Sequence, residues 1–165
     1  MRIMGIDPGL HITGYGIIDV AGNRIGLIEA GCIRTGAHQQ MCQRLNTIFT
    51  EIESIVNEFH PDQFSVENLY SHYRNPETAI IMGHARGVIF LVAGKHQIEL
   101  AEYSATRIKK SLSGNGHASK QQIQKMVQST LNLKEAPEPV DVSDALAAAL
   151  CHANYNRHSL KIGKL

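Results

Sequence analysis

The chain has 165 residues, 43% of them hydrophobic and 19% charged, so it is long enough for one domain with a substantial core. Its formal net charge is only +1 at neutral pH, which excludes a protein that binds nucleic acid by bulk positive charge. The longest apolar runs, residues 88–93 and 145–151, are too short to span a bilayer, and the chain opens directly into an expected strand. We therefore expect a globular protein with no membrane partner and a cytoplasmic location.

Charge is distributed unevenly along the chain. Residues 1–100 carry seven Lys/Arg and ten Asp/Glu, whereas residues 101–165 carry nine and five. No acid occurs between Glu102 and Glu135, and this acid-free window contains six basic residues. Such a window is either the solvated face of two helices or, as we prefer, a surface that binds a polyanion.

The cysteines, Cys32, Cys42 and Cys151, are odd in number, widely separated and set among apolar neighbours. This pattern predicts reduced thiols in the core of a cytosolic protein. It argues against both a disulfide and a cysteine metal site.

The first part of the chain predicts three strands. Residues 1–6 form an apolar run that Pro8 and Gly9 end, and residues 12–20 alternate in polarity with glycines that permit close backbone approach. A hairpin turn then leads into a third strand at residues 24–35. From residue 39 to 58 the apolar period changes to that of a helix.

The middle of the chain alternates strands with helices. Residues 64–67 predict a short strand that returns from a helix and therefore lies parallel to the first strand. Asn75 and Pro76 are typical of a helix start, and this helix extends to about residue 93. It is apolar nearly all round at residues 88–92, which places it in the core or against another chain.

The last part of the chain begins with a fifth strand at residues 98–102, followed by a basic helix at 105–112. A serine–glutamine capping box starts a helix at 120–131, and the final helix begins near Asp141. This order predicts an α/β fold with a mixed sheet flanked by helices. We expect one domain over residues 1–156 and assign nothing to the tail that follows.

Four carboxylates fall where expected strands end or helices begin. Asp7 and Glu67 each end a short apolar strand, and Asp141 and Asp144 lie three residues apart at the start of the last helix. As an alternative, the side chain of Asp7 could close a turn, and Asp141 or Asp144 could serve only to complement the dipole at the start of the helix. Because function in α/β sheets collects at strand ends, we expect the four side chains to converge.

Converging carboxylates repel one another, and a hard divalent cation offsets that repulsion. Mg²⁺ accepts carboxylate oxygens and keeps several waters and positions for a substrate phosphate. Two such ions, roughly 3.5–4 Å apart, can stabilise the attacking and leaving oxygens of a phosphodiester displacement. The carboxylates therefore favour a metal-dependent phosphodiester hydrolase.

The motifs GIDPG, TGYGII, GCIRT, VENLY, GHARG and VDVSDALAAAL occur in this order and extend over nearly the whole chain. Together they resemble the RuvC family of Holliday-junction resolvases. The resemblance implies an RNase H-like fold with a five-stranded sheet, and a homodimer that cuts a four-way DNA junction symmetrically. It implies two Mg²⁺ ions per site, replaceable by Mn²⁺, and the RuvA–RuvB branch-migration complex as a partner. The implied catalytic and metal-binding tetrad is Asp7, Glu67, Asp141 and Asp144.

Three further residues match family positions that contact DNA. Lys109 and Lys120 match two basic residues near the active site, and Lys120 begins a helix whose N-terminus itself favours phosphate. Tyr70 matches an aromatic residue able to stack on an unpaired base, although phenylalanine is more usual there. This chain also has an extra residue within 71–74. The alternatives are two surface lysines and a loop aromatic that covers the core.

Three other functions are alternatives to this one. An RNase H-like nuclease could instead cut RNA–DNA hybrids or process RNA, and cleavage assays on a junction and on a hybrid separate these activities. A sugar-kinase-like nucleotide binder also opens with Asp and Gly after its first strand, but it needs a second domain for which 165 residues leave no room. A DNA-binding module without catalysis leaves all four carboxylates unexplained.

Overall fold

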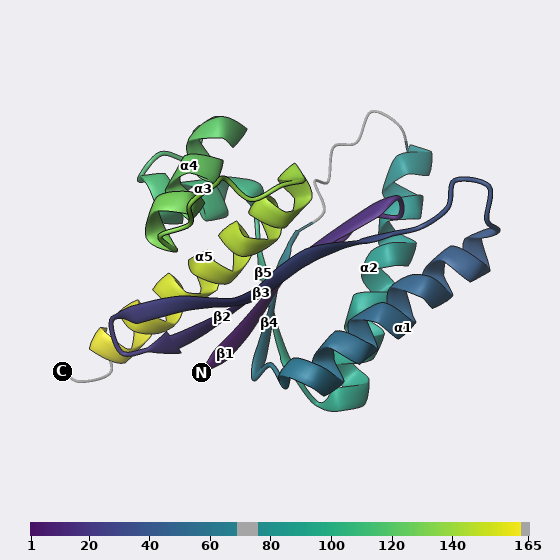
Figure 1. The fold of residues 1–165 in the computed structure, drawn as a ribbon, viewed down its shortest axis with the longest axis horizontal. Coiled ribbons are helices and arrows are strands. Elements are labelled where there is room, and N and C mark those ends of the chain that lie inside the picture. The colour runs from purple at the N-terminus through teal and green to yellow at the C-terminus, as the bar shows by residue number, and fades with distance from the viewer. Residues whose placement is uncertain (69–75, 163–165) are drawn as a thin grey trace.

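The computed structural model describes the backbone of residues 1–68 and 76–162, and the side chains of these ranges as far as residue 157. Five strands form one sheet in the order β3-β2-β1-β4-β5 (Figure 1). β1 pairs antiparallel with β2, and β2 with β3, whereas β1–β4 and β4–β5 are parallel. The predicted five-stranded mixed sheet is confirmed. The strands are β1 (Arg2–Asp7), β2 (Ile12–Ala21), β3 (Arg24–Arg34), β4 (Gln63–Glu67) and β5 (Glu99–Tyr103).

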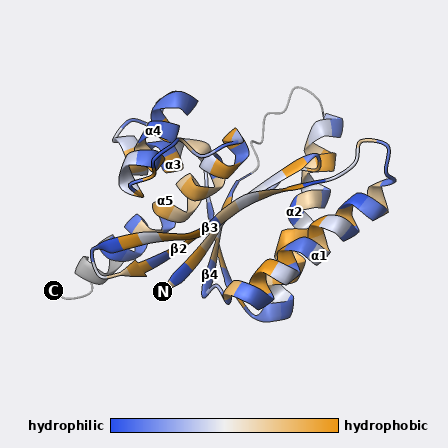
Figure 2. Ribbon diagram, in the orientation of Figure 1, coloured by the Kyte–Doolittle hydropathy of each residue, from blue (hydrophilic) through white to orange (hydrophobic). Residues whose placement is uncertain are grey.

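Helices cover both faces of the sheet, with α1 and α2 on one face and α5 on the other (Figure 1). The shorter α3 and α4 pack on α5, so this side of the molecule is one layer thicker. Hydrophobic residues line α1, α2 and α5, as Figure 2 shows. The helices are α1 (Met41–Phe59), α2 (Pro76–His96), α3 (Ala105–Ser113), α4 (Lys120–Thr130) and α5 (Val140–Ile162).

The two-residue period of β1 decides which side chains face which helices. Met4 and Ile6 belong to the core shared with α1 and α2, whereas Ile3 belongs to the core shared with α5. Successive side chains of a strand point to opposite faces, so Gly5 and Asp7 follow Ile3 onto the α5 side. The register of β1 therefore directs its terminal carboxylate toward the start of α5.

Two glycines allow α5 to lie almost directly on the backbone of the sheet. A Cβ at Gly5 would be 2.0 Å from the carbonyl oxygen of Ala145, and a Cβ at Gly14 would be 2.1 Å from that of Asp141. Both distances are far below van der Waals contact, so only a residue without a side chain fits. The first turn of α5 is thereby held over the ends of β1 and β2.

Helix α2 is apolar on more than one side, as its sequence predicts. Ala85, Ile89 and Val92 are buried against the sheet and α1, yet Ile80 and Leu91 are 61% and 62% exposed. By length and composition alone α2 could cross a membrane, but a core helix meets the same criterion, and α2 is partly buried in the core. Its exposed apolar side is free to meet another protein surface.

Two details differ from what the sequence predicts. Cys42 is exposed on the first turn of α1, as its neighbour Met41 is; Cys151 is buried and Cys32 half-buried, and all three are free thiols. Helix α5 continues to Ile162, so it crosses the boundary set at residue 156. The predicted helix cap Asn75 lies outside the described residues.

Candidate active site

Asp7 and Glu67 are neighbours at the carboxyl ends of two parallel strands. Ile6 of β1 lies beside Val66 of β4, and the two carboxylates occupy the next position on each strand. Ser65 donates a hydrogen bond to the Ala148 carbonyl of α5, so Glu67, two residues later, lies on the same α5 side of the sheet. Strand register alone therefore brings the first two predicted acids together.

The start of α5 supplies the other two carboxylates. Gly14 of β2 pairs with Asp7 across the strands, and the Asp141 backbone lies directly on Gly14. Asp144 follows one turn later on the same side of the helix. Two of the predicted acids thus come from strand ends and two from the helix that crosses them, and their shared role stays a prediction.

A pocket of about 190 Å³ opens between these elements. Asp7, Glu67 and Asp144 line it together with Lys109 of α3 and Lys120 of α4. Its apolar lining consists of Ala105, Ile108, Ile123 and Ala147. Asp141 is not among the residues that line this pocket, although its charge acts on Asp7, and Tyr70 lies outside the described part of the chain.

Burial and mutual repulsion act strongly on the two strand carboxylates. Desolvation, followed by the charges of Asp144, Glu67 and Asp141, raises the pKa of Asp7 to about 7. Desolvation and Asp144 also raise the pKa of Glu67, while nearby lysines oppose that rise. The pocket therefore holds more negative charge than its own lysines neutralise, and it favours an added cation.

Lys120 is the first residue of α4 and lies at the mouth of the pocket. Ser119 and Gln122 form the predicted capping box, which fixes the start of the helix. The Lys120 ammonium is 2.9 Å from Asp144 Oδ2, and this hydrogen bond is the main cause that raises its pKa. Because the lysine side chain is 70% exposed, the pair adds little stability and Lys120 can exchange it for another anion.

The donor set fits a hard divalent cation. All four acids offer carboxylate oxygen, the ligand that Mg²⁺, Mn²⁺ and Ca²⁺ prefer, and neither histidine nor cysteine lines the pocket. Within the described ranges, no three metal-binding side chains form a ready-made cage.

Arg86 of α2 supports Glu67 from the other side of the sheet edge. Its guanidinium donates to the Glu67 carbonyl oxygen and to Asn68 Oδ1, the latter at 3.3 Å, and it forms an ion pair with Glu102. Arg86 is only 8% exposed, and desolvation lowers its pKa. The sequence alone indicates no role for Arg86, although it lies in the GHARG motif, because only the fold places it beside Glu67.

The chain matches the family model described as crossover junction endodeoxyribonuclease RuvC over residues 3–152. The chain belongs to the RuvC family. RuvC from Ruminiclostridium cellulolyticum is 43% identical over 163 residues, 99% of this chain and 98% of its own length. RuvC from Heliobacterium modesticaldum is 46% identical over the same length and with the same coverage. The family membership expected from the motifs is confirmed, and with it the crossover junction endonuclease class.

Solved RuvC structures have the same fold. The structure of T. thermophilus RuvC in complex with a Holliday junction substrate has a TM-score of 0.92 and 33% identity, and the match covers 96% of each chain. The yeast mitochondrial Holliday junction resolvase Ydc2 has a TM-score of 0.68 at 10% identity, which shows a shared fold alone. The expected RNase H-like α/β architecture is confirmed.

Proposed function

We propose that this RuvC-family endonuclease resolves four-way DNA junctions by paired, symmetric, Mg²⁺-dependent hydrolysis of two phosphodiester bonds, in recombination and DNA repair. The observation that carries the proposal is the single pocket in which Asp7, Glu67 and Asp144 face Lys109 and Lys120. Acids that bind metal and lysines that bind phosphate are the two requirements of such a reaction.

The roles of the residues follow from their positions. Asp7 and Glu67 are held on strand ends, so they form the rigid part of the site, and Asp144 and Asp141 approach from α5. When bound, divalent cations supply an activated water and stabilise charge on the scissile phosphate. Lys109 and Lys120 neutralise the phosphate, and the N-terminus of α4 adds a favourable dipole beside Lys120. Tyr70, by resemblance, stacks on an unpaired base.

The exposed apolar side of α2 supports a homodimer. Leu91 and Phe90 are 62% and 38% exposed, and a two-fold symmetric junction is matched by two sites related by a two-fold axis. We further propose a cytoplasmic location and cooperation with the RuvA–RuvB complex, which the family membership implies. Mn²⁺ is expected to replace Mg²⁺.

The test of this function separates binding from chemistry. Replacing Asp7 by Asn removes one charge and one good metal ligand but keeps the shape of the side chain. Asp7→Asn should bind a junction in EDTA at least as tightly as the parent, because repulsion of the phosphate falls. In Mg²⁺ it should cut orders of magnitude more slowly. With Ca²⁺ the parent should bind but cleave little.

The measurements are a gel-shift titration in EDTA and a single-turnover cleavage assay that maps nicks. Glu58→Gln, which removes an exposed carboxylate from α1, is the matched control and should behave as the parent. Near-parental cutting by Asp7→Asn would remove this residue from the catalytic centre. Efficient cutting of an RNA–DNA hybrid with none of the junction would favour the alternative nuclease.

A further inference from the structure

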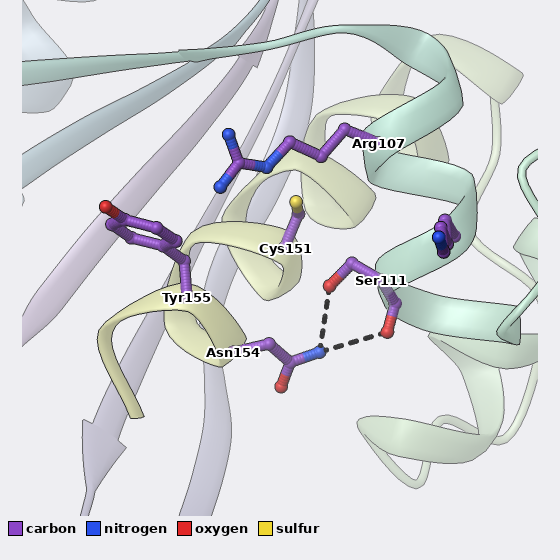
Figure 3. Close-up of a pocket in the computed structure, with 6 residues that line it drawn as sticks. Arg107, Ser111, Cys151, Asn154 and Tyr155 are labelled. Carbon is purple, nitrogen blue, oxygen red and sulfur yellow. Dashed lines mark hydrogen bonds between the residues drawn. The ribbon is translucent and has the colours of Figure 1, made fainter. Parts of the chain in front are cut away.

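A second pocket, of about 360 Å³, lies between α3 and α5 (Figure 3). Arg107, Lys110 and Ser111 line it from α3, whereas Ala105, Ile108 and Lys109 line the carboxylate pocket. Because each residue turns about 100° around an α-helix, these two sets occupy opposite sides of α3. The helix therefore separates the second pocket from the candidate active site. The residues that line it from α5 are Cys151, Asn154 and Tyr155.

Arg107 is held in place by two aromatic rings. Its guanidinium carbon lies 5.0 Å from the centre of the Tyr103 ring and 5.1 Å from that of Tyr155. Figure 3 shows the side chain reaching from α3 across Cys151 toward Tyr155. The rings contact the face of the guanidinium and leave its N–H groups available. None of the described residues accepts a hydrogen bond from these N–H groups. Arg107 is thus a preorganised donor whose usual partner is an oxyanion.

The other groups in this pocket add to its preference for an anion. Lys110 supplies a second cation, and no carboxylate is among the lining residues. Burial raises the pKa of the Cys151 thiol, so this group stays uncharged. The Asn154 amide donates to the Ser111 carbonyl oxygen and Oγ, at 3.4 and 3.2 Å, which links the two walls (Figure 3). The pocket therefore has one cation positioned by two rings, Arg107, and a second, exposed cation, Lys110.

We propose that this pocket binds a backbone phosphate of the same DNA arm whose scissile phosphate enters the carboxylate pocket. The two sites are separated by one helix, about 10–12 Å across, which is close to the width of the major groove, about 12 Å. One arm can therefore reach both sites without large bending. The cations of both pockets, Arg107 and Lys110 in one and Lys109 and Lys120 in the other, belong to the acid-free window. The inference rests on the proposed function, because it requires that DNA be the substrate.

The test measures the salt dependence of junction binding in EDTA for Arg107→Gln, Lys110→Gln and the double variant. Each lost phosphate contact should make the slope of log affinity against log salt shallower by about one. Lys125→Gln is the matched control, because this exposed lysine lies in the same acid-free window but lines neither pocket. An equal change in the control would mean a diffuse basic surface and would overturn the assignment.

A second measurement separates a binding role from a structural one. Arg107→Lys keeps the charge and should retain most of the slope, whatever its effect on the melting temperature. The Arg107 Nε–H resonance of the parent should shift when a junction is added. If only millimolar inorganic phosphate shifts it, the pocket takes a free anion and the DNA assignment is wrong. A parent with no salt-dependent junction binding would contradict the proposed function itself, whereas unchanged slopes in the variants contradict this inference alone.

Discussion

Arg86 connects the exposed side of α2 to the backbone of Glu67. Its guanidinium lies 4.9 Å from the centre of the Phe90 ring, and Phe90 is partly exposed on α2. The same group donates to the Glu67 carbonyl oxygen and pairs with Glu102. Arg86 touches neither the pocket nor a substrate position, so its effect on the reaction passes through the position of Glu67.

Replacing Arg86 by Met should therefore slow cleavage more than it weakens junction binding. A displacement of about 1 Å in a reacting group can cost roughly 10²-fold in rate, and we expect a loss in kcat of that order. Arg86→Lys should recover part of the rate, because one ammonium can still reach one of the acceptors. Arg24→Gln, in the exposed β2–β3 hairpin, serves as the charge control. If Arg86→Met keeps the parental kcat, Arg86 contributes to packing and does not position Glu67.

His152 is a buried side chain that bridges Tyr103 and Gln63, and its Nε2 also lies 3.3 Å from the Asn156 amide nitrogen. It is 5% exposed, its Nδ1 is 2.7 Å from the Tyr103 hydroxyl and its Nε2 is 2.8 Å from Gln63 Oε1. Since Oε1 only accepts, Nε2 carries the proton and Nδ1 accepts from the tyrosine. Burial lowers the pKa of His152 below its ordinary value of 6.5.

This lowered pKa predicts an acid-sensitive contribution to stability. Above about pH 6.5 the ring is neutral in both the folded and the unfolded chain, so it does not make the free energy of unfolding depend on pH. As the pH falls through this value, the unfolded chain takes up a proton that the folded chain refuses, and the free energy of unfolding drops by at most about 1.4 kcal/mol per pH unit. His152→Gln should make the curve of unfolding free energy against pH flatter just below about pH 6.5. Urea unfolding at a series of pH values measures this free energy, with His117→Gln, at an exposed position, as the control. If the parent and His152→Gln lose stability equally as the pH falls, His152 is not the group responsible.

At the scale of elements, the contact of α5 with β1 and β2 determines the spacing of the four acids. An alanine at Gly5 would place its Cβ 2.0 Å from the Ala145 carbonyl oxygen and 2.8 Å from the Ala149 nitrogen. Both atoms belong to the helix backbone, so no side-chain rotation can relieve the clash. The helix as a whole has to move, and Asp144 moves with it.

Gly5→Ala should therefore cost roughly 1–3 kcal/mol of stability or more, and it should abolish cleavage even at temperatures where the variant is folded. Gly26→Ala is the matched control, because a Cβ at this β3 glycine meets no atom within 4 Å. Thermal melting and single-turnover cleavage are measured together for both. Cleavage near the parental rate in folded Gly5→Ala would show that the spacing tolerates a shift of α5.

The sequence predicts these elements well because each has a local signature. The alternation of residues 12–20, the helical stripe of residues 39–58 and the capping box at Ser119 depend only on near neighbours. The polar partners of Arg86 and the Tyr155 ring beside Arg107 could not be predicted, since they come from other segments of the chain. The sequence also predicts a core position for Cys42, but the phase of α1 turns Cys42 outward together with Met41.

At the scale of the whole molecule, the exposed apolar residues of α2 lead us to expect a homodimer. Ile80, Phe90 and Leu91 are exposed apolar residues of one helix, and burying them against a second copy removes them from water. The parent should be a homodimer at micromolar concentration, and Leu91→Glu should make it a monomer, because burying the added charge is costly.

Light scattering coupled to size exclusion measures this directly. Met126→Glu is the control, because Met126 is also an exposed apolar residue but lies on α4. It should leave the mass unchanged. A strictly monomeric parent would contradict the placement of the interface on α2, as would a Leu91→Glu variant that remains dimeric.

The contact between β1 and α5 joins nearly the first and nearly the last residues of the chain. During translation, β1 to β3 and α1 can form early, but the sheet face that carries Gly5 and Asp7 stays uncovered until α5 leaves the ribosome. Such long-range contacts are also the slow ones in folding. A chain that lacks α5 therefore holds Asp7 and Glu67 without Asp141 and Asp144, and we expect the nuclease to become active only after α5 has packed on the sheet. Cleavage assays on ribosome-bound chains arrested before and after α5 would show this order.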